Sequence, residues 1–126
     1  YKLANKINTK AEQLSKPLIG LIEINTSGDK SKKGFKPLLT DEIIKCLHLD
    51  HLNISGLMTL GPYSQNPTDT RRAFVDLRKF LDQVNKEFGS EKLTELSMGM
   101  SGDFITAIEE GSTMVRVGTS LFGARE

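Results

Sequence analysis

The chain has 126 residues, of which 37% are hydrophobic and 26% charged, a composition typical of one globular domain. Its net charge of +1 and the lack of an apolar run of roughly 18 residues argue against nucleic-acid and membrane roles. The single cysteine, Cys46, excludes an internal disulfide framework and favours a cytoplasmic protein, with an organelle as the alternative.

The first segment carries apolar residues at helical spacing: Leu3, Ile7, Ala11 and Leu14. No capping residue precedes it, so we expect the chain to start inside a helix and to be a fragment. Pro17 ends this helix. Residues 18–25, LIGLIEIN, are nearly all apolar, which predicts a strand covered on both faces, as in parallel sheets.

The middle of the chain alternates between helix and strand patterns. A polar loop over 26–36 leads to a helix capped by Thr40, and residues 54–60 predict the next strand. The loop GPYSQNPTD, residues 61–69, is dense in turn formers. A third helix follows, ends at Gly89 and has its apolar residues at alternating spacings of three and four: Phe74, Leu77, Leu81, Val84 and Phe88.

The last third predicts a strand over 96–99, a short helix over 103–110 and a final strand over 114–118. Strands that alternate with helices imply right-handed crossovers and a parallel sheet, either a barrel or a doubly wound sheet. In both folds the loops after the strands build the site.

Two of these loops, GMSGD and GTSLFG, place small residues at a strand end, where backbone N–H groups approach an anion closely. We therefore expect a phosphate site that includes Ser101. The alternative is that Ser101 only caps the helix that follows it.

Arg116 lies in the last predicted strand, and alternation places it on the same face as Gly118, toward the small-residue end. A buried Arg needs a partner, which is either a carboxylate such as Glu23 or a polar ligand. His48 and His51 are expected to be surface residues and not metal ligands. Lys30, Lys32 and Lys33 are expected to be solvated, with contact to a phosphate as the alternative. Cys46 is expected to be a packed thiol.

Three segments carry a resemblance to a known family: LSMGMSGDFITAIEEGSTMVRVGTSLFGARE at 96–126, INTSGDKSKKG at 24–34 and ISGLMTLG at 54–61. They resemble the pyridoxal 5'-phosphate homeostasis proteins of the YggS/PROSC type, and the match covers essentially the whole chain. The resemblance implies a (β/α)8 barrel similar to the N-terminal domain of alanine racemase. Residues 1–126 would then be a single-domain fragment, the second half of a barrel that binds pyridoxal phosphate.

The resemblance also implies roles for individual residues. Ser101, Gly118 and Thr119 would hold the cofactor phosphate, and Arg116 would face the pyridine nitrogen. The lysine that forms the Schiff base would precede Tyr1, in agreement with the placement of every lysine here in a predicted helix or loop.

The function implied is non-catalytic carriage of pyridoxal phosphate and regulation of vitamin B6 and amino-acid pools. Possible partners are enzymes that depend on this cofactor, and the full-length protein is expected to be a monomer. Two alternatives remain open at this point, a racemase-like or decarboxylase-like enzyme with the same cofactor and a barrel that binds a phosphosugar.

Overall fold

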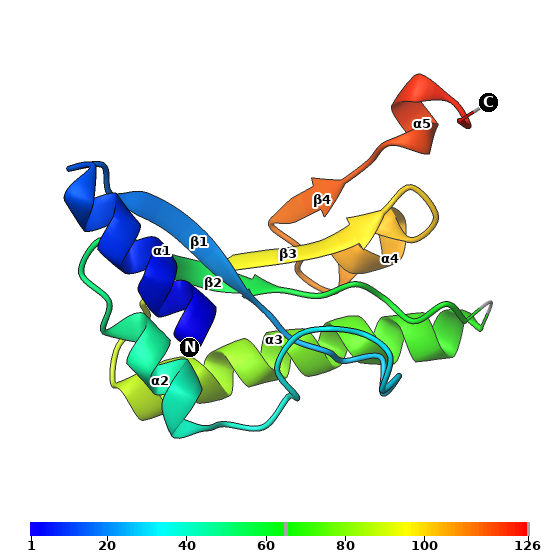
Figure 1. The fold of residues 1–126 in the computed structure, drawn as a ribbon. Helices are drawn as coiled ribbons and strands as arrows, with labels where there is room; N and C mark the ends of the chain where they lie inside the picture. Colours follow the sequence, from blue (N-terminus) through cyan, green and yellow to red (C-terminus); the bar gives the residue numbers. More distant parts are fainter. Residues whose placement is uncertain (65, 126) are drawn as a thin grey trace.

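The computed structural model describes residues 1–64 and 66–125, so Gln65 of the predicted 61–69 loop and Glu126 of the C-terminal motif lie outside the described residues. Helices and strands alternate in this order: α1 (Lys2–Gln13), β1 (Leu18–Glu23), α2 (Asp41–Leu47), β2 (Leu52–Met58), α3 (Pro67–Phe88), β3 (Glu95–Met100), α4 (Phe104–Glu109), β4 (Met114–Arg116) and α5 (Thr119–Phe122). Figure 1 shows the strands side by side, with α2 and α3 along one side of the sheet.

The four strands are parallel and lie in chain order, β1-β2-β3-β4. A doubly wound sheet reverses its strand order at a switch point, whereas the strands of a (β/α)8 barrel follow one another around the ring. The observed order therefore favours four consecutive strands of a barrel over the doubly wound alternative.

Helix α3 contributes a long row of apolar side chains to the core. Its apolar side chains Phe74, Leu77 and Val84 are fully buried against the sheet, as their spacing predicts. The helix begins at Pro67, earlier than expected, because the Asn66 side chain caps it and Pro suits its first turn. It ends at Gly89, whose φ of 79° is the left-handed conformation that glycine adopts readily.

Several predicted boundaries are wrong by two residues. Strand β1 ends at Glu23 and not at Asn25, because the chain turns there toward Phe35, with which Ile24 makes an isolated bridge. Strand β2 starts at Leu52, whose N–H donates to the Asn8 side chain of α1. Strand β4 ends at Arg116, so Gly118 lies outside the strand, in the turn that starts the unpredicted helix α5.

The described residues cover only one face of β1, although the sequence predicts cover on both. Ile22 and Ile24 are buried in the core, whereas Ile19, on the alternate face, is 77% exposed. Met114 of β4 and Phe122 of α5 are also exposed. Among the helices at residues 1–64 and 66–125, none combines the length and the apolar character needed to span a membrane.

Candidate functional site

The residues expected to hold a phosphate lie together after β3 and β4. Ser101 follows β3, and Gly118 and Thr119 begin α5. The Oγ of Ser101 accepts one hydrogen bond from the backbone N–H of Gly118, at 3.2 Å, and another from that of Ser120, at 3.2 Å. Two backbone donors therefore converge on one oxygen, and the second belongs to Ser120, which the sequence did not indicate.

The interpretation of Ser101 as a helix cap is wrong. The residue before the first turn of α4 is Asp103, and its Oδ1 accepts from the N–H of Met100 at 2.7 Å. Strand β3 runs through Met100, so a turn separates Ser101 from the helix. The Ser101 hydroxyl consequently contacts the start of α5 instead of the start of α4.

Arg116 is held by neutral oxygens. Its Nη1 donates to the Oγ of Ser97, and its Nη2 donates to the backbone oxygen of Thr59 at 2.9 Å. Burial lowers the pKa of the guanidinium below its ordinary value, and the negative charges of Asp103 and Glu23 oppose that shift. A lowered value for Arg still leaves the group positively charged at neutral pH.

The alternative of an ion pair between Arg116 and Glu23 is wrong. Within residues 1–64 and 66–125, no carboxylate oxygen lies within 4.0 Å of the Arg116 guanidinium. Glu23 acts on Arg116 only as a more distant charge. The guanidinium has five N–H donors, of which two are used by the two oxygens described above, so donors remain for a ligand.

Ser97 and Thr59 are site residues that sequence reasoning missed. Ser97 is 1% exposed and Thr59 is 0% exposed. The Oγ1 of Thr59 donates to the backbone oxygen of Ile24 at 2.7 Å and shares a hydrogen bond with the Oγ1 of Thr26 at 2.9 Å. The sequence feature that could have identified them is a polar residue inside or directly after an apolar strand. Such a residue is expected to have a hydrogen-bond partner, because buried polar groups are almost always hydrogen-bonded.

The loop after β1 folds over the end of β2. The Nζ of Lys32 donates to the backbone oxygen of Gly61 and lies 4.1 Å from the ring centroid of Tyr63. The expectation of a solvated loop therefore holds for the exposed Lys30 and Lys33 but is wrong for Lys32.

The remaining sequence candidates lie away from this site. His48 packs against the Phe88 ring, with centroids 5.1 Å apart, and His51 Nε2 lies 3.7 Å from a Glu12 carboxylate oxygen. No three residues of the His, Cys, Asp and Glu types gather as metal ligands in the described part of the chain. Cys46 is 2% exposed, and burial raises the pKa of its thiol, so the prediction of a packed thiol is confirmed.

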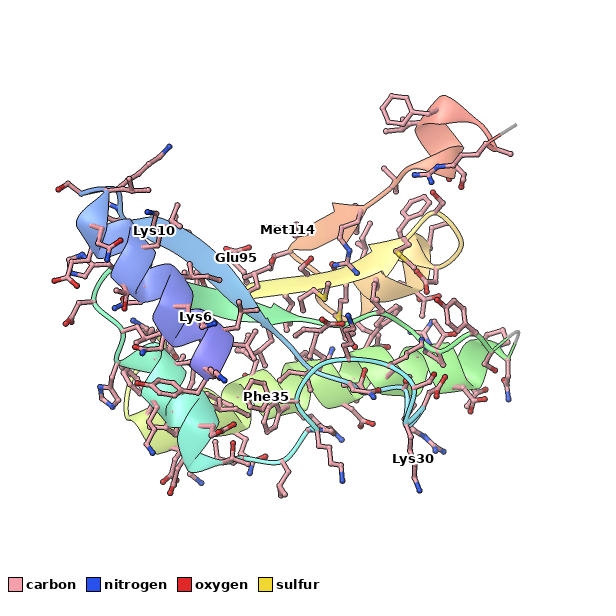
Figure 2. The ribbon with its side chains drawn as sticks, in the orientation of Figure 1. Lys6, Lys10, Lys30, Phe35, Glu95 and Met114 are labelled. Carbon is pink, nitrogen blue, oxygen red and sulfur yellow. The ribbon has the colours of Figure 1, made fainter. Side chains whose placement is uncertain are left out.

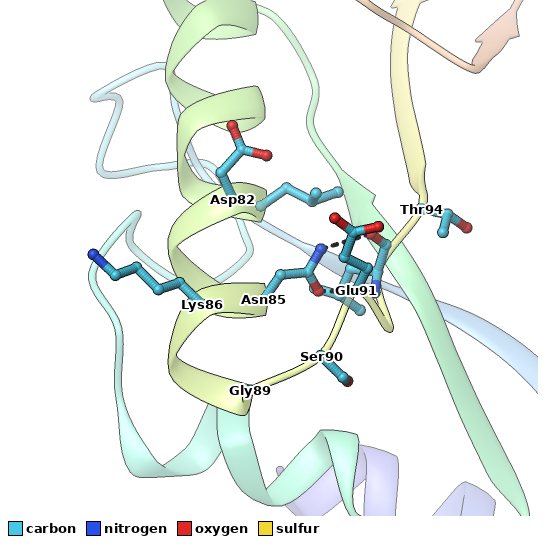
Figure 3. Close-up of a pocket in the computed structure, with 9 residues that line it drawn as sticks. Asp82, Asn85, Lys86, Gly89, Ser90, Glu91 and Thr94 are labelled. Carbon is cyan, nitrogen blue, oxygen red and sulfur yellow. Dashed lines mark hydrogen bonds between the residues drawn. The ribbon is translucent and has the colours of Figure 1, made fainter.

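A cavity of about 600 Å³ lies at the other end of the sheet (Figure 3). The end of α3 and the segment entering β3 line it, including Asp82, Asn85 and Glu91. Asn85 connects α3 to the segment that enters β3. Its side chain donates to the Leu93 oxygen at 2.8 Å and accepts from the Leu93 N–H at 2.9 Å. In barrels, binding residues follow the carboxyl ends of strands, so we assign this cavity no role in the site.

Comparison with known proteins decides the family. The sequence model of the alanine racemase N-terminal domain matches residues 1–126. The chain belongs to this family. The family assignment confirms the predicted barrel-type fold. Figure 2 shows the side chains on this half barrel.

Individual relatives agree with the resemblance found in the sequence. The pyridoxal phosphate homeostasis protein of Aquifex aeolicus is 42% identical over 125 residues, which are 98% of this chain and 54% of the relative. The structure of PipY from Synechococcus elongatus with pyridoxal phosphate bound has a TM-score of 0.86 at 31% identity, covering 98% of this chain and 57% of that chain. The resemblance to pyridoxal phosphate homeostasis proteins is thus confirmed.

A more distant structure shares the fold alone. Alanine racemase of Clostridium difficile has a TM-score of 0.76 at 23% identity, covering 98% of this chain and 32% of that chain. The present chain spans about half the length of the curated relatives it matches.

Proposed function

We propose that this chain is the second half of a barrel that binds pyridoxal 5'-phosphate and serves as a non-catalytic carrier in the homeostasis of that cofactor. Its relatives are named pyridoxal phosphate homeostasis proteins, and a structure of PipY contains bound pyridoxal phosphate. The observation that carries the proposal is the convergence of the Gly118 and Ser120 amides on Ser101, next to a partly buried Arg116.

The residues present fit a phosphate group. Ser101 provides a hydroxyl, and Gly118 and Ser120 provide backbone donors at the start of α5. Space is available beside these donors, since a Cβ placed on Gly118 would meet no atom within 4 Å. A phosphate oxygen is a stronger acceptor than a hydroxyl, so it would compete with Ser101 for the two amides. Thr119, the first residue of α5, would add its own hydroxyl.

Arg116 would serve the ring nitrogen of the cofactor. When bound, pyridoxal phosphate supplies an aldehyde that reacts with amines and a ring whose protonated form draws electrons from the reacting centre. A guanidinium has no acceptor and stays charged, so Arg116 would donate to the ring nitrogen and keep it unprotonated. The arrangement therefore favours storage of the cofactor over catalysis on it.

The covalent anchor would come from outside these 126 residues. None of the four strands carries a lysine. Lys92, which precedes β3, donates to the Asn53 side chain at 3.3 Å and lies at the amino end of the sheet, away from Ser101. The proposal for the whole protein extends to a monomer in the cytoplasm that passes cofactor to dependent apoenzymes, without a nucleic-acid or membrane partner.

Calorimetric titration of this chain with pyridoxal phosphate and with inorganic phosphate tests the proposal. Ser101→Ala should weaken both ligands, whereas Arg116→Gln should weaken pyridoxal phosphate by about 10-fold or more, since bonds to charged groups contribute about 1.5–3 kcal/mol. Arg116→Gln should leave phosphate unchanged. Arg72→Gln, a change in an exposed residue of α3, is the matched control.

Two outcomes would overturn the proposal. Equal affinity of the Arg116→Gln variant and the unchanged chain for pyridoxal phosphate would indicate a site for phosphate alone, as in a barrel that binds phosphosugars. Steady exchange of the α-proton of an amino acid, in the presence of the cofactor, would indicate a racemase-like enzyme.

A further inference from the structure

Strand β4 does not fix Arg116 through its backbone alone. It has three residues, and its pairing with β3 consists of Ser97 with Met114 and Met100 with Arg116, with a register shift between them. An irregularity of this kind disrupts the regular ladder that would otherwise orient the strand that carries the guanidinium. Other contacts must therefore determine the direction in which the guanidinium points.

The two oxygens that hold Arg116 belong to two other parts of the sheet. Ser97 lies in β3 and Thr59 directly follows β2, and the N–H of Thr59 donates to the backbone oxygen of Ser97 at 3.1 Å. Both residues are buried, with exposures of 1% and 0%. The acceptors therefore have a fixed separation, and a planar guanidinium that donates to both has one orientation.

Thr59 extends this support to the first strand. Its Oγ1 donates to the oxygen of Ile24 and meets the Oγ1 of Thr26, which both follow β1. A continuous chain of hydrogen bonds thus joins Arg116 on β4 to the end of β1. No member of it is an acid, so the support itself does not change with pH near neutrality.

We propose that Ser97 and Thr59 are positioning residues, which orient the Arg116 guanidinium so that its unused N–H groups point at the ring nitrogen of pyridoxal phosphate. This inference rests on the proposed function. A purely structural role for the same contacts would affect the stability of β4 but not the discrimination between ligands with and without a ring nitrogen.

Two measurements on the full 126-residue chain test the inference. The first compares affinity for pyridoxal phosphate with affinity for its 1-deaza analogue, in which CH replaces the ring nitrogen. The unchanged chain should prefer pyridoxal phosphate by about 10-fold, the value of one charge-assisted bond. Ser97→Ala should reduce this preference to less than about 3-fold without changing affinity for inorganic phosphate, and Ser97→Thr, which retains a hydroxyl, should restore it.

The second measurement follows the side-chain N–H signals of Arg116 by ¹⁵N NMR in the absence of ligand, with Arg116→Lys to assign them. Restricted rotation in the unchanged chain and free rotation in Ser97→Ala would support positioning, whether or not pyridoxal phosphate binds. Failure of the unchanged chain to bind pyridoxal phosphate would refute the proposed function alone. Full ligand discrimination or restricted rotation in a folded Ser97→Ala variant would overturn the inference. If Ser97→Ala does not fold, Thr59→Val, which keeps the accepting carbonyl but loses Oγ1, and its control Thr59→Ser give the same test.

Discussion

Gly99, inside the SMGM segment, should be the least replaceable residue of the strand that leads to Ser101. Its φ is 101°, a conformation that residues with a Cβ rarely adopt. A Cβ at this position would lie 2.6 Å from the Cβ of Ala107 and 3.1 Å from the Cα of Phe104. Gly99→Ala would therefore strain the backbone and push α4 away from β3.

The magnitude follows from these two effects. The unfavourable φ costs about 1–2 kcal/mol for a residue with a Cβ, and overpacking typically costs about 1–3 kcal/mol. Together they predict a loss of about 2–5 kcal/mol in the free energy of unfolding, a large share of the roughly 5–15 kcal/mol of a typical domain. Unfolding in urea, followed by circular dichroism, should show a midpoint lower by about 1–2 M.

Gly102→Ala is the matched control, three residues further along the chain. Gly102 has no positive φ, and a Cβ there would meet no atom within 4 Å. Its substitution should change the midpoint very little. Equal midpoints for Gly99→Ala and Gly102→Ala would refute the assignment of strain and crowding to Gly99.

Three further predictions concern contacts that hold the sheet and helices together. Asn8→Ala should destabilise the fold by about 1–3 kcal/mol in urea unfolding, because Asn8 Oδ1 accepts from the backbone N–H groups of His51 and Leu52. Asn85→Asp should destabilise it more at pH 7 than at pH 3, because a carboxylate loses the bond to the Leu93 oxygen and regains a donor only when protonated. Glu110→Gln should reduce the loss of stability below pH 4.5. Arg71 and then Arg78 lower the pKa of Glu110 in the folded chain. The contribution of Glu110 to the free energy of unfolding is therefore present above pH 4.5 and disappears as the pH falls through the lowered pKa.

The first two of these variants have a control in the same element. Asn5→Ala, in α1, should have a smaller effect than Asn8→Ala, and equal losses would indicate a change in helix propensity instead of lost hydrogen bonds. Asn85→Ala loses both bonds with Leu93 at any pH, so it should lack the pH dependence of Asn85→Asp. An acid unfolding profile of Glu110→Gln that matches the original chain would contradict the role of Arg71 and Arg78.

Much of the fold could be predicted from local pattern. The spacing of Phe74, Leu77 and Val84 identified the longest helix, because a helix that packs on a sheet must present one apolar stripe. Strand boundaries were less certain, because hydrophobicity does not determine where pairing stops. The end of β1 depends on the turn toward Phe35, and the start of β2 on a side chain of α1 that is 44 positions earlier.

The sequence by itself determined the alternation of helices and strands and the family, and it indicated part of the candidate site: Ser101, Arg116, Gly118 and Thr119. These follow from periodicity and from motifs that are contiguous in the chain. Only the tertiary structure decided the contacts of those residues: Ser101 accepts from the start of α5 instead of capping α4, and Arg116 binds Ser97 and Thr59 instead of Glu23. The physical reason is that hydrogen-bond partners depend on distances between separate strands, and those distances arise only when the sheet is assembled.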